Sequence, residues 1–552
     1  MDEKLQNLTE RIFLKTWRPF AWIAGMIFIV YFTTLFSGIV YLDDNVLVVN
    51  NYVYNKNLSN LPHTFVEDIF RSPAGTGSFY RPVLRQSFMF DAQFGQNSVI
   101  FMSHLSNLVM HVLAIILLFI FIQKLNVRKD LAFLFSIFFG IHPLTSQTVA
   151  FIPGRNDSLL AIFVFLSLIL FLKYIESKKW KYLFAHILFM TIALFTKETG
   201  AVLPFVCISY LAIFIGYKQI WIDLRKYIWL LVGWAISFSG YFVMRHLVLK
   251  TFVGNADYHV IPAIYNNIPS LLPTIGKIFL PFELSVFPIL KDMTMVYGIL
   301  SLLLIAIWCL LTKNKAYKYI LFGSSWFILF ILLTLIKPTD TTPEFSENRI
   351  YIPMFGFIFI LLGLGSIELK NFVYKKYLLI AGILIPILIL SSITIYRNKY
   401  YSNNISFWIN ATETSPSSAF NHNNLGAMYF LDNKYDQAKA EFIKTLEINP
   451  SEKLTNNNLG LIYMNSGDFA KSEQSFVNEI KINPLYDNAY SNLGLLFFKT
   501  NKLEYAEELW LKTIEINPNN TDALYNLMFL YNSQKNTDKA NYYKIQLEKL
   551  GY

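Results

Sequence analysis

Apolar runs of about 20 residues recur between residues 19 and 396, and they constrain the fold more than any other feature of the chain. A helix needs a run of about that length to cross the hydrocarbon core of a bilayer. The composition agrees, because 54% hydrophobic and 15% charged residues make the chain too apolar for an ordinary soluble protein. The sequence therefore predicts an all-α fold with a polytopic transmembrane domain.

Eleven such runs are predicted to span the membrane. The run 17–40 is longer than a signal-peptide core, and no small-residue cleavage pattern follows it, so we interpret it as an uncleaved anchor helix. The predicted spans are 19–39, 103–122, 130–147, 157–173, 181–196, 200–216, 227–248, 293–312, 317–336, 350–367 and 377–396. The segment 263–290 holds five prolines at or beside it, so it is interpreted as re-entrant or surface-lying.

Every second connection between these runs is basic, which predicts the orientation. Lys and Arg gather in the N-terminal segment and in 124–129, 173–181, 218–226, 313–318 and 375–376. Because such loops stay in the cytoplasm, the N-terminus is expected there, and loops 41–102 and 337–349 on the opposite side. With eleven crossings, the C-terminal part lies on that side too. The membrane is then a bacterial inner membrane with the C-terminal part outside, or an endoplasmic reticulum membrane with it in the lumen.

The formal charge of +10 is explained by these basic loops, so no nucleic-acid partner is expected. The two cysteines, Cys207 and Cys309, each lie within an apolar run. Neither a disulfide framework nor a cysteine-based metal site is therefore predicted.

Hydrophobicity falls after residue 397, and a period of 34 residues begins. Pro416, Pro450, Pro484 and Pro518 mark it, and Leu, Gly, aromatic and Ala positions recur in phase. This period is typical of tetratricopeptide repeats, in which each unit is a pair of antiparallel helices. We therefore divide the chain into a transmembrane domain, 1–397, and a repeat α-solenoid, 398–552, with about four repeats and a capping helix at 403–414.

Asparagines recur at one register of the repeats, on the first helix of each pair, which usually lines the concave surface: Asn424, Asn458, Asn492 and Asn526. Carboxamides offer both donors and acceptors, so a row of them can hold the backbone of an extended peptide without recognising its sequence. The ladder resembles that of the repeat superhelix of O-GlcNAc transferase. The alternative is that the chain is simply rich in asparagine, but four matches in four repeats favour peptide binding.

Polar and ionisable residues collect at the non-cytoplasmic ends of the apolar runs. Such residues are costly near the membrane interior and indicate function when they gather on one side. They are Asp43, Asp44, Arg81, His104, Asn107, His111, His142, Arg155, Asn156, Asp157, Lys197, Glu198, Glu347 and Arg349. Each has a structural alternative: Asp157 as a helix cap, Lys197 with Glu198 as a loop ion pair, His111 as a satisfied interior group. Together they predict a polar cavity with carboxylates for proton transfer and cations for an anionic group.

These residues carry a family resemblance. Asp-Asp at 43–44, Tyr-Arg-Pro at 80–82, His-x-x-Asn-x-x-x-His at 104–111, His-Pro at 142, Gly-Arg-x-Asp at 154–157, Lys-Glu at 197 and Glu-x-Arg-x-Tyr-x-Pro at 347–353 resemble the transmembrane and tetratricopeptide-repeat O-mannosyltransferase family. More broadly, the chain is similar to membrane glycosyltransferases of the GT-C fold. The likeness covers nearly the whole chain in the same domain order, although longer members have more repeats.

The resemblance implies transfer of a sugar from a polyprenyl or dolichyl phosphate to a Ser or Thr of a protein, on the non-cytoplasmic side. In the mechanism we expect, Asp44, with Asp43 as the other candidate, is the general base for an inverting attack. Arg81, Arg155 and Arg349, assisted by Lys197 or His142, bind the lipid phosphate. His104, His111, Asp157, Glu198 and Glu347 line the donor pocket. No cofactor or metal is required, although a divalent ion on the paired aspartates stays an alternative.

Two other functions remain open at this stage. The chain could be a non-catalytic membrane-anchored scaffold that recruits envelope proteins through its repeats. It could also be a ligase or polymerase of lipid-linked glycans. The sugar cannot be named from short motifs.

Overall fold

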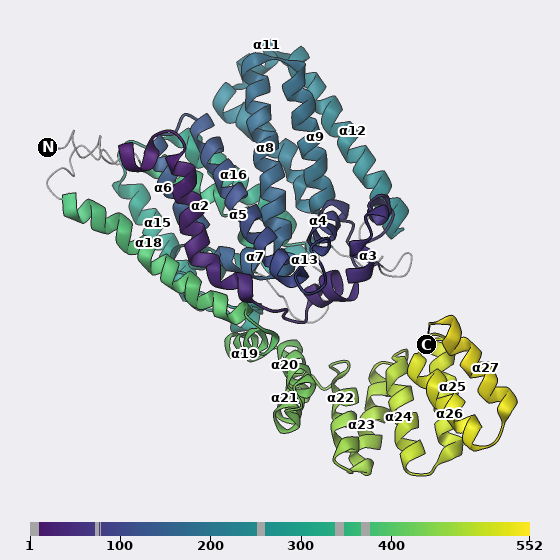
Figure 1. Cartoon of the computed structure of the whole chain (residues 1–552). Coiled ribbons are helices and arrows are strands. Elements are labelled where there is room, and N and C mark those ends of the chain that lie inside the picture. Colours follow the sequence, from purple (N-terminus) through teal and green to yellow (C-terminus); the bar gives the residue numbers. More distant parts are fainter. Residues whose placement is uncertain are drawn as a thin grey trace. The chain divides into compact units, whose positions relative to one another are not determined.

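The computed structural model describes residues 10–71, 77, 79–250, 260–336, 347–365 and 376–551, and all the secondary structure in this part is helical (Figure 1). This confirms the predicted all-α class. The chain forms two compact units, Met1–Thr414 and Ser415–Tyr552. The helix α19 (Asn404–Thr414) thus falls in the first unit, whereas the sequence division after residue 397 places it with the repeats.

The first unit is built from the helices before residue 415. They are α2 (Arg18–Tyr31), α3 (Tyr52–Lys56), α4 (Pro82–Ala92), α5 (Val99–Lys124), α6 (Lys129–Gly140), α7 (Ser146–Ala150), α8 (Arg155–Ser177), α9 (Trp180–Thr196), α10 (Leu203–Tyr210), α11 (Tyr217–Ile222), α12 (Leu224–Leu249), α13 (Val260–Asn267), α14 (Leu271–Phe279), α15 (Val296–Leu311), α16 (Tyr317–Thr334), α17 (Phe355–Leu364), α18 (Lys376–Asn398) and α19.

Six helical segments in the described residues are long and apolar enough to cross a membrane: Arg18–Phe36, Val99–Lys124, Ile152–Ser177, Glu198–Ile215, Tyr227–Leu249 and Tyr317–Thr334. A seventh counts only if α6 and residues 143–150 form one span, although they are bent by 55°. Proline lacks the N–H that would continue the helix, so Pro143 explains this bend. The other four predicted runs coincide with α9, α15, α17 and α18, but the predicted count of eleven spans is not confirmed.

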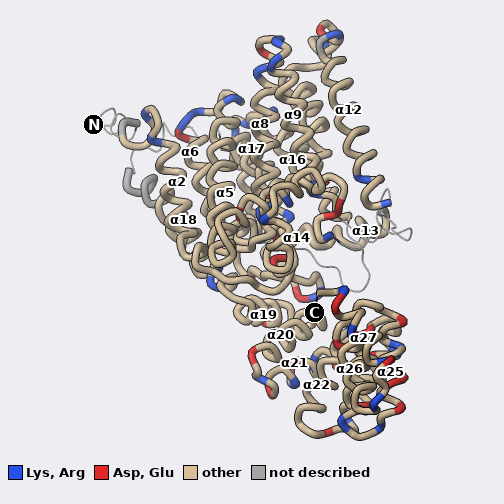
Figure 2. Tube along the Cα trace, turned by 45° about the vertical axis from the view of Figure 1, so that its right-hand side comes forward, with Lys and Arg blue, Asp and Glu red and all other residues tan. Residues whose placement is uncertain are grey.

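The segment predicted to be re-entrant or surface-lying contains only short helices. The helices α13 and α14 have 8 and 9 residues, so neither is long enough to cross a bilayer. Figure 2 shows Lys and Arg residues gathered where α8 meets α9 and at the start of α12, at one end of the long helices. The helices α4, α7 and α13 lie toward the other end (Figure 1).

Aromatic side chains fill the centre of the first unit. Phe121, Phe165, Trp326 and Phe359 are all buried, and the rings of Phe165 and Trp326 stack with their centroids 6.1 Å apart. The helices α16 and α17 approach so closely that a Cβ at Gly323 would lie 2.4 Å from the Gly356 carbonyl oxygen. The core therefore fixes α17, and with it the turn Glu347–Ile350 that precedes it.

The second unit contains four helix pairs, as the 34-residue period predicts. They are α20 (Ala419–Leu431) with α21 (Tyr435–Ile448), α22 (Thr455–Asn465) with α23 (Phe469–Ile482), α24 (Asp487–Lys499) with α25 (Leu503–Ile516), and α26 (Thr521–Ser533) with α27 (Thr537–Lys549). A Cβ at Gly460 would lie 2.6 Å from the Phe476 ring, so this recurring glycine allows the close approach of paired helices.

The predicted capping helix is present as α19. Its Trp408 is fully buried and donates a hydrogen bond from Nε1 to the carbonyl oxygen of Val40, at 3.1 Å. In addition, Asn410 accepts a hydrogen bond from the Val286 backbone N–H at 3.1 Å. The helix therefore packs within the first unit.

Candidate functional site

The acidic pair at the start of the long loop contains two very different carboxylates. Asp44 is 1% exposed, and its carboxylate accepts hydrogen bonds from the backbone N–H groups of Val40, Leu42 and Asn45 at 2.6, 3.0 and 2.9 Å. Burial raises the pKa of Asp44, and these backbone bonds oppose the rise. Asp44 thus shapes the loop, and its acceptor sites are already used, which counts against the predicted role as the base.

Asp43 is the carboxylate that remains open to solvent. In the described part of the chain its side chain has no hydrogen bond or ion pair. Neighbouring atoms still surround much of it, and this partial desolvation raises the pKa of Asp43, while the positive charge of Arg81 opposes the rise. A carboxylate with a raised pKa and free acceptor sites is suited to take a proton.

Arg81 joins the long loop to the turn after α9. Its Nε and Nη2 donate to both carboxylate oxygens of Glu198 at 2.8 to 3.2 Å, and the guanidinium lies 4.4 Å from the Phe79 ring centroid. Arg81 directly precedes α4, where Pro82 occupies the first turn, and Glu198 begins a 3₁₀ turn. Glu198 therefore pairs with Arg81 and not with Lys197, the loop partner considered from the sequence.

Lys197 pairs instead with Asp157, from the first turn of α8. The Nζ–Oδ1 distance is 2.6 Å, and Asn348 donates to the other oxygen of Asp157 at 3.2 Å. Burial lowers the pKa of Lys197, and the charge of Asp157 opposes this. The pair anchors the end of α9 and the start of α8 to the turn before α17.

A small cavity of about 10 Å³ lies beside this pair. It is lined by Asp157, Lys197, Thr199, Phe330, Thr334, Arg349, Ile352 and Pro353. Arg349 is half-buried and donates from Nη1 to the Thr334 carbonyl oxygen at 3.1 Å. Two cations thus border one cavity. We call Asp43, Arg81, Asp157, Lys197, Glu198 and Arg349 the open cluster.

Arg155 does not join the open cluster. Its side chain is 0% exposed and pairs with Asp91 of α4, with an Nη1–Oδ2 distance of 2.6 Å. It also donates to Asn107 Oδ1 and to the Ser103 carbonyl oxygen, both at 2.7 Å. Its donors are used inside the protein, where it ties α8 to α4 and α5, and these contacts count against the predicted role in binding the lipid phosphate.

Glu347, which was predicted to line the donor pocket, is likewise buried among internal partners. It is 3% exposed and forms ion pairs with Lys277 at 2.6 Å and Arg397 at 2.5 Å. Arg397 also donates to the carbonyl oxygens of Pro143 and Ser285, at 2.9 and 3.1 Å. Glu347 therefore holds the turn that carries Arg349 against α14 and α18.

The three predicted histidines are buried and make internal contacts. His111 bonds the Tyr351 hydroxyl at 2.8 Å and the Gly140 carbonyl oxygen at 2.9 Å, which matches the structural alternative. His142 bonds the Ile278 carbonyl oxygen and accepts from the Leu144 N–H. His104 contacts the Gly38 carbonyl oxygen at 3.3 Å. None borders the small cavity, so their predicted roles in donor or phosphate binding find no support in these contacts.

The four ladder asparagines are half-buried on α20, α22, α24 and α26. Asn424 donates to the Phe420 carbonyl oxygen of its own helix, and Asn492 donates to Asn457 Oδ1 at 2.9 Å. No internal hydrogen bond is formed by the side chains of Asn458 and Asn526 within the described residues. Peptide binding by the ladder stays a prediction.

The sequence analysis did not identify four residues that are the partners of predicted site residues. Asp91 pairs with Arg155, Asn348 bonds to Asp157, and Glu347 pairs with both Lys277 and Arg397. Arg397 directly follows the apolar run 377–396, and an ionisable residue at that depth needs a partner. That signal could have identified Arg397, but not which residue it meets. Within the described residues, no group of three or more His, Cys, Asp or Glu side chains is arranged to hold a metal ion.

Two family models match parts of the chain. Residues 92–242 match the family described as dolichyl-phosphate-mannose-protein mannosyltransferase, and residues 455–484 match the tetratricopeptide repeat. The first match includes Asp157, Lys197 and Glu198 of the open cluster. The resemblance predicted from the sequence is thereby confirmed.

Curated relatives show the same likeness at modest identity. The chain is 25% identical to the protein O-mannosyl-transferase F38B6.6 of Caenorhabditis elegans, over 72% of this chain and 58% of the relative. It is 24% identical to the protein O-mannosyl-transferase TMTC3 of Homo sapiens, over 34% of this chain and 21% of the relative. The matches thus span less than two thirds of these relatives. Among solved structures, MamA is similar at 23% identity over 27% of this chain and 87% of that chain, with a TM-score of 0.25.

Proposed function

We propose that this protein is a membrane glycosyltransferase that moves a sugar from a polyprenyl or dolichyl phosphate to a Ser or Thr hydroxyl of a protein. The observation that carries the proposal is the open cluster, in which a free carboxylate and three cations lie within one electrostatic network. Half of that cluster lies within the residues that match the mannosyltransferase model. The named relatives support the same reaction class.

Asp43 serves as the general base in this proposal, in place of Asp44. Its carboxylate takes the proton of the acceptor hydroxyl as the hydroxyl oxygen attacks the anomeric carbon. The bond between that carbon and the phosphate oxygen breaks at the same time, so the configuration inverts. The lipid phosphate leaves with the bonding electrons, and the proton stays on Asp43.

Lys197 and Arg349 stabilise the leaving phosphate. Both border the cavity beside Asp157, and positive groups held in place where negative charge develops lower the barrier. Arg81 keeps Asp43 ionised through its positive charge, although Glu198 neutralises part of that charge. The reaction takes place on the non-cytoplasmic side, where the alternation of basic loops would put these residues.

Transfer by the purified protein tests the proposal. The donor is a polyprenyl-phosphate hexose, the acceptor is a Ser/Thr-containing protein, and intact mass reports the added hexose. Asp43→Asn should reduce the rate by about 10²- to 10⁴-fold, the contribution of a general base. Asp44→Asn should lower thermal stability through its loop contacts, while the folded fraction keeps its rate.

Unchanged transfer in Asp43→Asn would contradict the mechanism. The scaffold alternative makes the opposite prediction: replacing all four ladder asparagines abolishes its function, whereas Asp43→Asn and Arg349→Gln leave it intact. Comparing protein with lipid-linked glycan acceptors separates the ligase alternative.

A further inference from the structure

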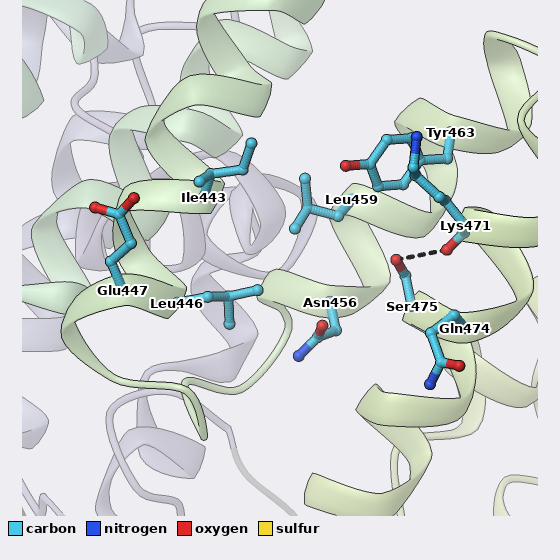
Figure 3. Close-up of a pocket in the computed structure, with 9 residues that line it drawn as sticks. All are labelled: Ile443, Leu446, Glu447, Asn456, Leu459, Tyr463, Lys471, Gln474 and Ser475. Atoms are coloured by element: carbon cyan, nitrogen blue, oxygen red, sulfur yellow. Dashed lines mark hydrogen bonds between the residues drawn. The ribbon is translucent and has the colours of Figure 1, made fainter.

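The second unit contains an open groove of about 470 Å³ between α21, α22 and α23. Its volume falls within the roughly 300–1,000 Å³ typical of ligand pockets. Figure 3 shows Asn456, Leu459 and Tyr463 of α22 between two flanking helices, with Ile443 on one side and Ser475 on the other. The floor is mainly apolar, and amide and hydroxyl groups lie at its edge.

The repeat register explains why this groove is open. At the register of Asn456, the other three repeats carry His422, Tyr490 and Leu524. His422 reaches back to the Pro416 carbonyl oxygen at 3.2 Å, and Tyr490 donates to the Pro484 carbonyl oxygen at 3.1 Å. The shorter side chain of Asn456 makes no such bond within the described residues. Asn456 is thus the smallest of the four side chains at this register, and the groove lies beside it.

The start of α22 is built differently from its sister helices. By the 34-residue period α22 would begin at 453, since α20 begins at 419 and α24 at 487, but it begins at 455. The carboxylate of Glu479 accepts hydrogen bonds from the N–H groups of Leu454 and Asn457, at 2.8 and 3.4 Å. Thr445 and Thr513 stand at the same register in two sister repeats. Glu479 thus stabilises the altered helix start that carries Asn456.

Asn456 itself supplies a second indication of a ligand. It is 5% exposed and lines the groove, yet its carboxamide has no hydrogen-bond partner within the described residues. An amide that lines an open groove without an internal partner can donate to and accept from a ligand bound there. The charges at the edge are already paired, Lys471 with Asp468 at 2.8 Å and Glu447 with Lys444 at 3.6 Å. A neutral occupant is therefore favoured over a charged one.

We propose that this groove is a docking site for a tyrosine side chain presented by another polypeptide. The ring occupies the space that Tyr490 fills in its own repeat, over Leu459 and between Ile443 and Ser475. The phenol hydroxyl reaches the Pro450 carbonyl oxygen, as the Tyr490 hydroxyl reaches Pro484. The Asn456 carboxamide bonds the backbone of the bound segment. This site is separate from the asparagine ladder and does not depend on the proposed transfer reaction.

Binding of two peptides to the full chain in detergent tests this site. The probes are acetyl-Gly-Ser-Gly-Tyr-Gly-Ser-Gly-amide and the same peptide with Ala in place of Tyr, followed by saturation-transfer NMR titration. The Tyr peptide should bind about tenfold more tightly, because only it buries a ring in the groove. Asn456→Tyr should remove that preference by filling the groove with the protein's own ring.

Two further variants make the result decisive. Ile443→Asp changes a side chain that is 41% exposed, so the fold should persist while the preference for Tyr is lost. Asn465→Tyr is the matched control, the same substitution on the same helix at an exposed position outside the groove, and it should leave the preference intact. Equal binding of the two peptides by the unaltered chain would overturn the proposal, as would a preference that survives in Asn456→Tyr or disappears in Asn465→Tyr.

Discussion

The open cluster and the two buried ionic groups, Arg155–Asp91 and Glu347–Lys277–Arg397, contain the same residue types. They differ in whether their charged side chains can still contact a substrate. Arg155 with Asp91, and Glu347 with Lys277 and Arg397, have almost no exposed surface, and they bond to one another and to backbone carbonyl groups. In the open cluster, Asp43 has free acceptor sites, and Arg349 and Lys197 border a cavity. Burial and saturation of hydrogen bonds therefore separate the two buried groups, which hold the fold, from Asp43, which is available for chemistry.

The largest expected effect comes from removing one member of a buried group. Arg155→Met leaves the Asp91 carboxylate buried without its cation, which should destabilise the protein by about 3–5 kcal/mol. Thermal unfolding of the detergent-solubilised protein measures this. Adding Asp91→Asn should recover part of the loss, because the uncompensated charge is then gone. A variant Arg155→Met with native stability but no transfer would instead assign Arg155 to the reaction.

Arg349→Gln should act on the reaction and not on the fold. The substitution removes one of the two cations at the cavity, and losing one such electrostatic contact should slow transfer by about 10²-fold. Thermal stability should change by about 1 kcal/mol or less, since Arg349 is only half-buried. Arg128→Gln is a matched control, because Arg128 is 63% exposed and pairs with Asp130 outside the open cluster. This variant should change neither the transfer rate nor the thermal stability.

These contrasts mark how far the sequence could predict the molecule. The 34-residue period predicted all eight helices of the repeats, because each repeat folds from contacts close in sequence. The apolar runs predicted helices at each position, but not the 55° bend at Pro143 or how many helices reach full spanning length.

The candidate site was harder to predict, because its pairing is decided between distant segments. The motifs identified Arg155 and Glu347 but not their partners. Arg155 pairs with Asp91 of α4. Glu347 pairs with Lys277 and Arg397, which are 70 and 50 residues away in the sequence. Only packing determines which carboxylate each cation finds. For the same reason, the sequence could not tell Asp43 from its neighbour Asp44.

The pH dependence of transfer tests the electrostatics of Asp43. The base must be ionised, so the rate falls as pH drops through its pKa in the folded protein. An ordinary aspartate has a pKa of about 3.9. Because desolvation raises the pKa of Asp43, the rate should fall at a higher pH than it would with an ordinary aspartate as the base. Arg81 opposes the rise, so Arg81→Gln should move the acid limb to still higher pH. An acid limb that is the same in both proteins would show that Asp43 is not the titrating group.

The smallest expected effects are those of the asparagine ladder. Here too, some side-chain carboxamides form internal hydrogen bonds and others do not. The side chains of Asn458 and Asn526 form no internal hydrogen bond in the described chain, whereas those of Asn424 and Asn492 are already bonded within the unit. If the ladder holds the acceptor backbone, Asn458→Ala and Asn526→Ala should each raise KM by about 2- to 10-fold, the worth of one hydrogen bond, with kcat unchanged. Asn424→Ala and Asn492→Ala should raise it less, because their amides must first give up internal partners. A fall in kcat instead of a rise in KM would place the ladder's effect in the chemical step and argue against backbone binding.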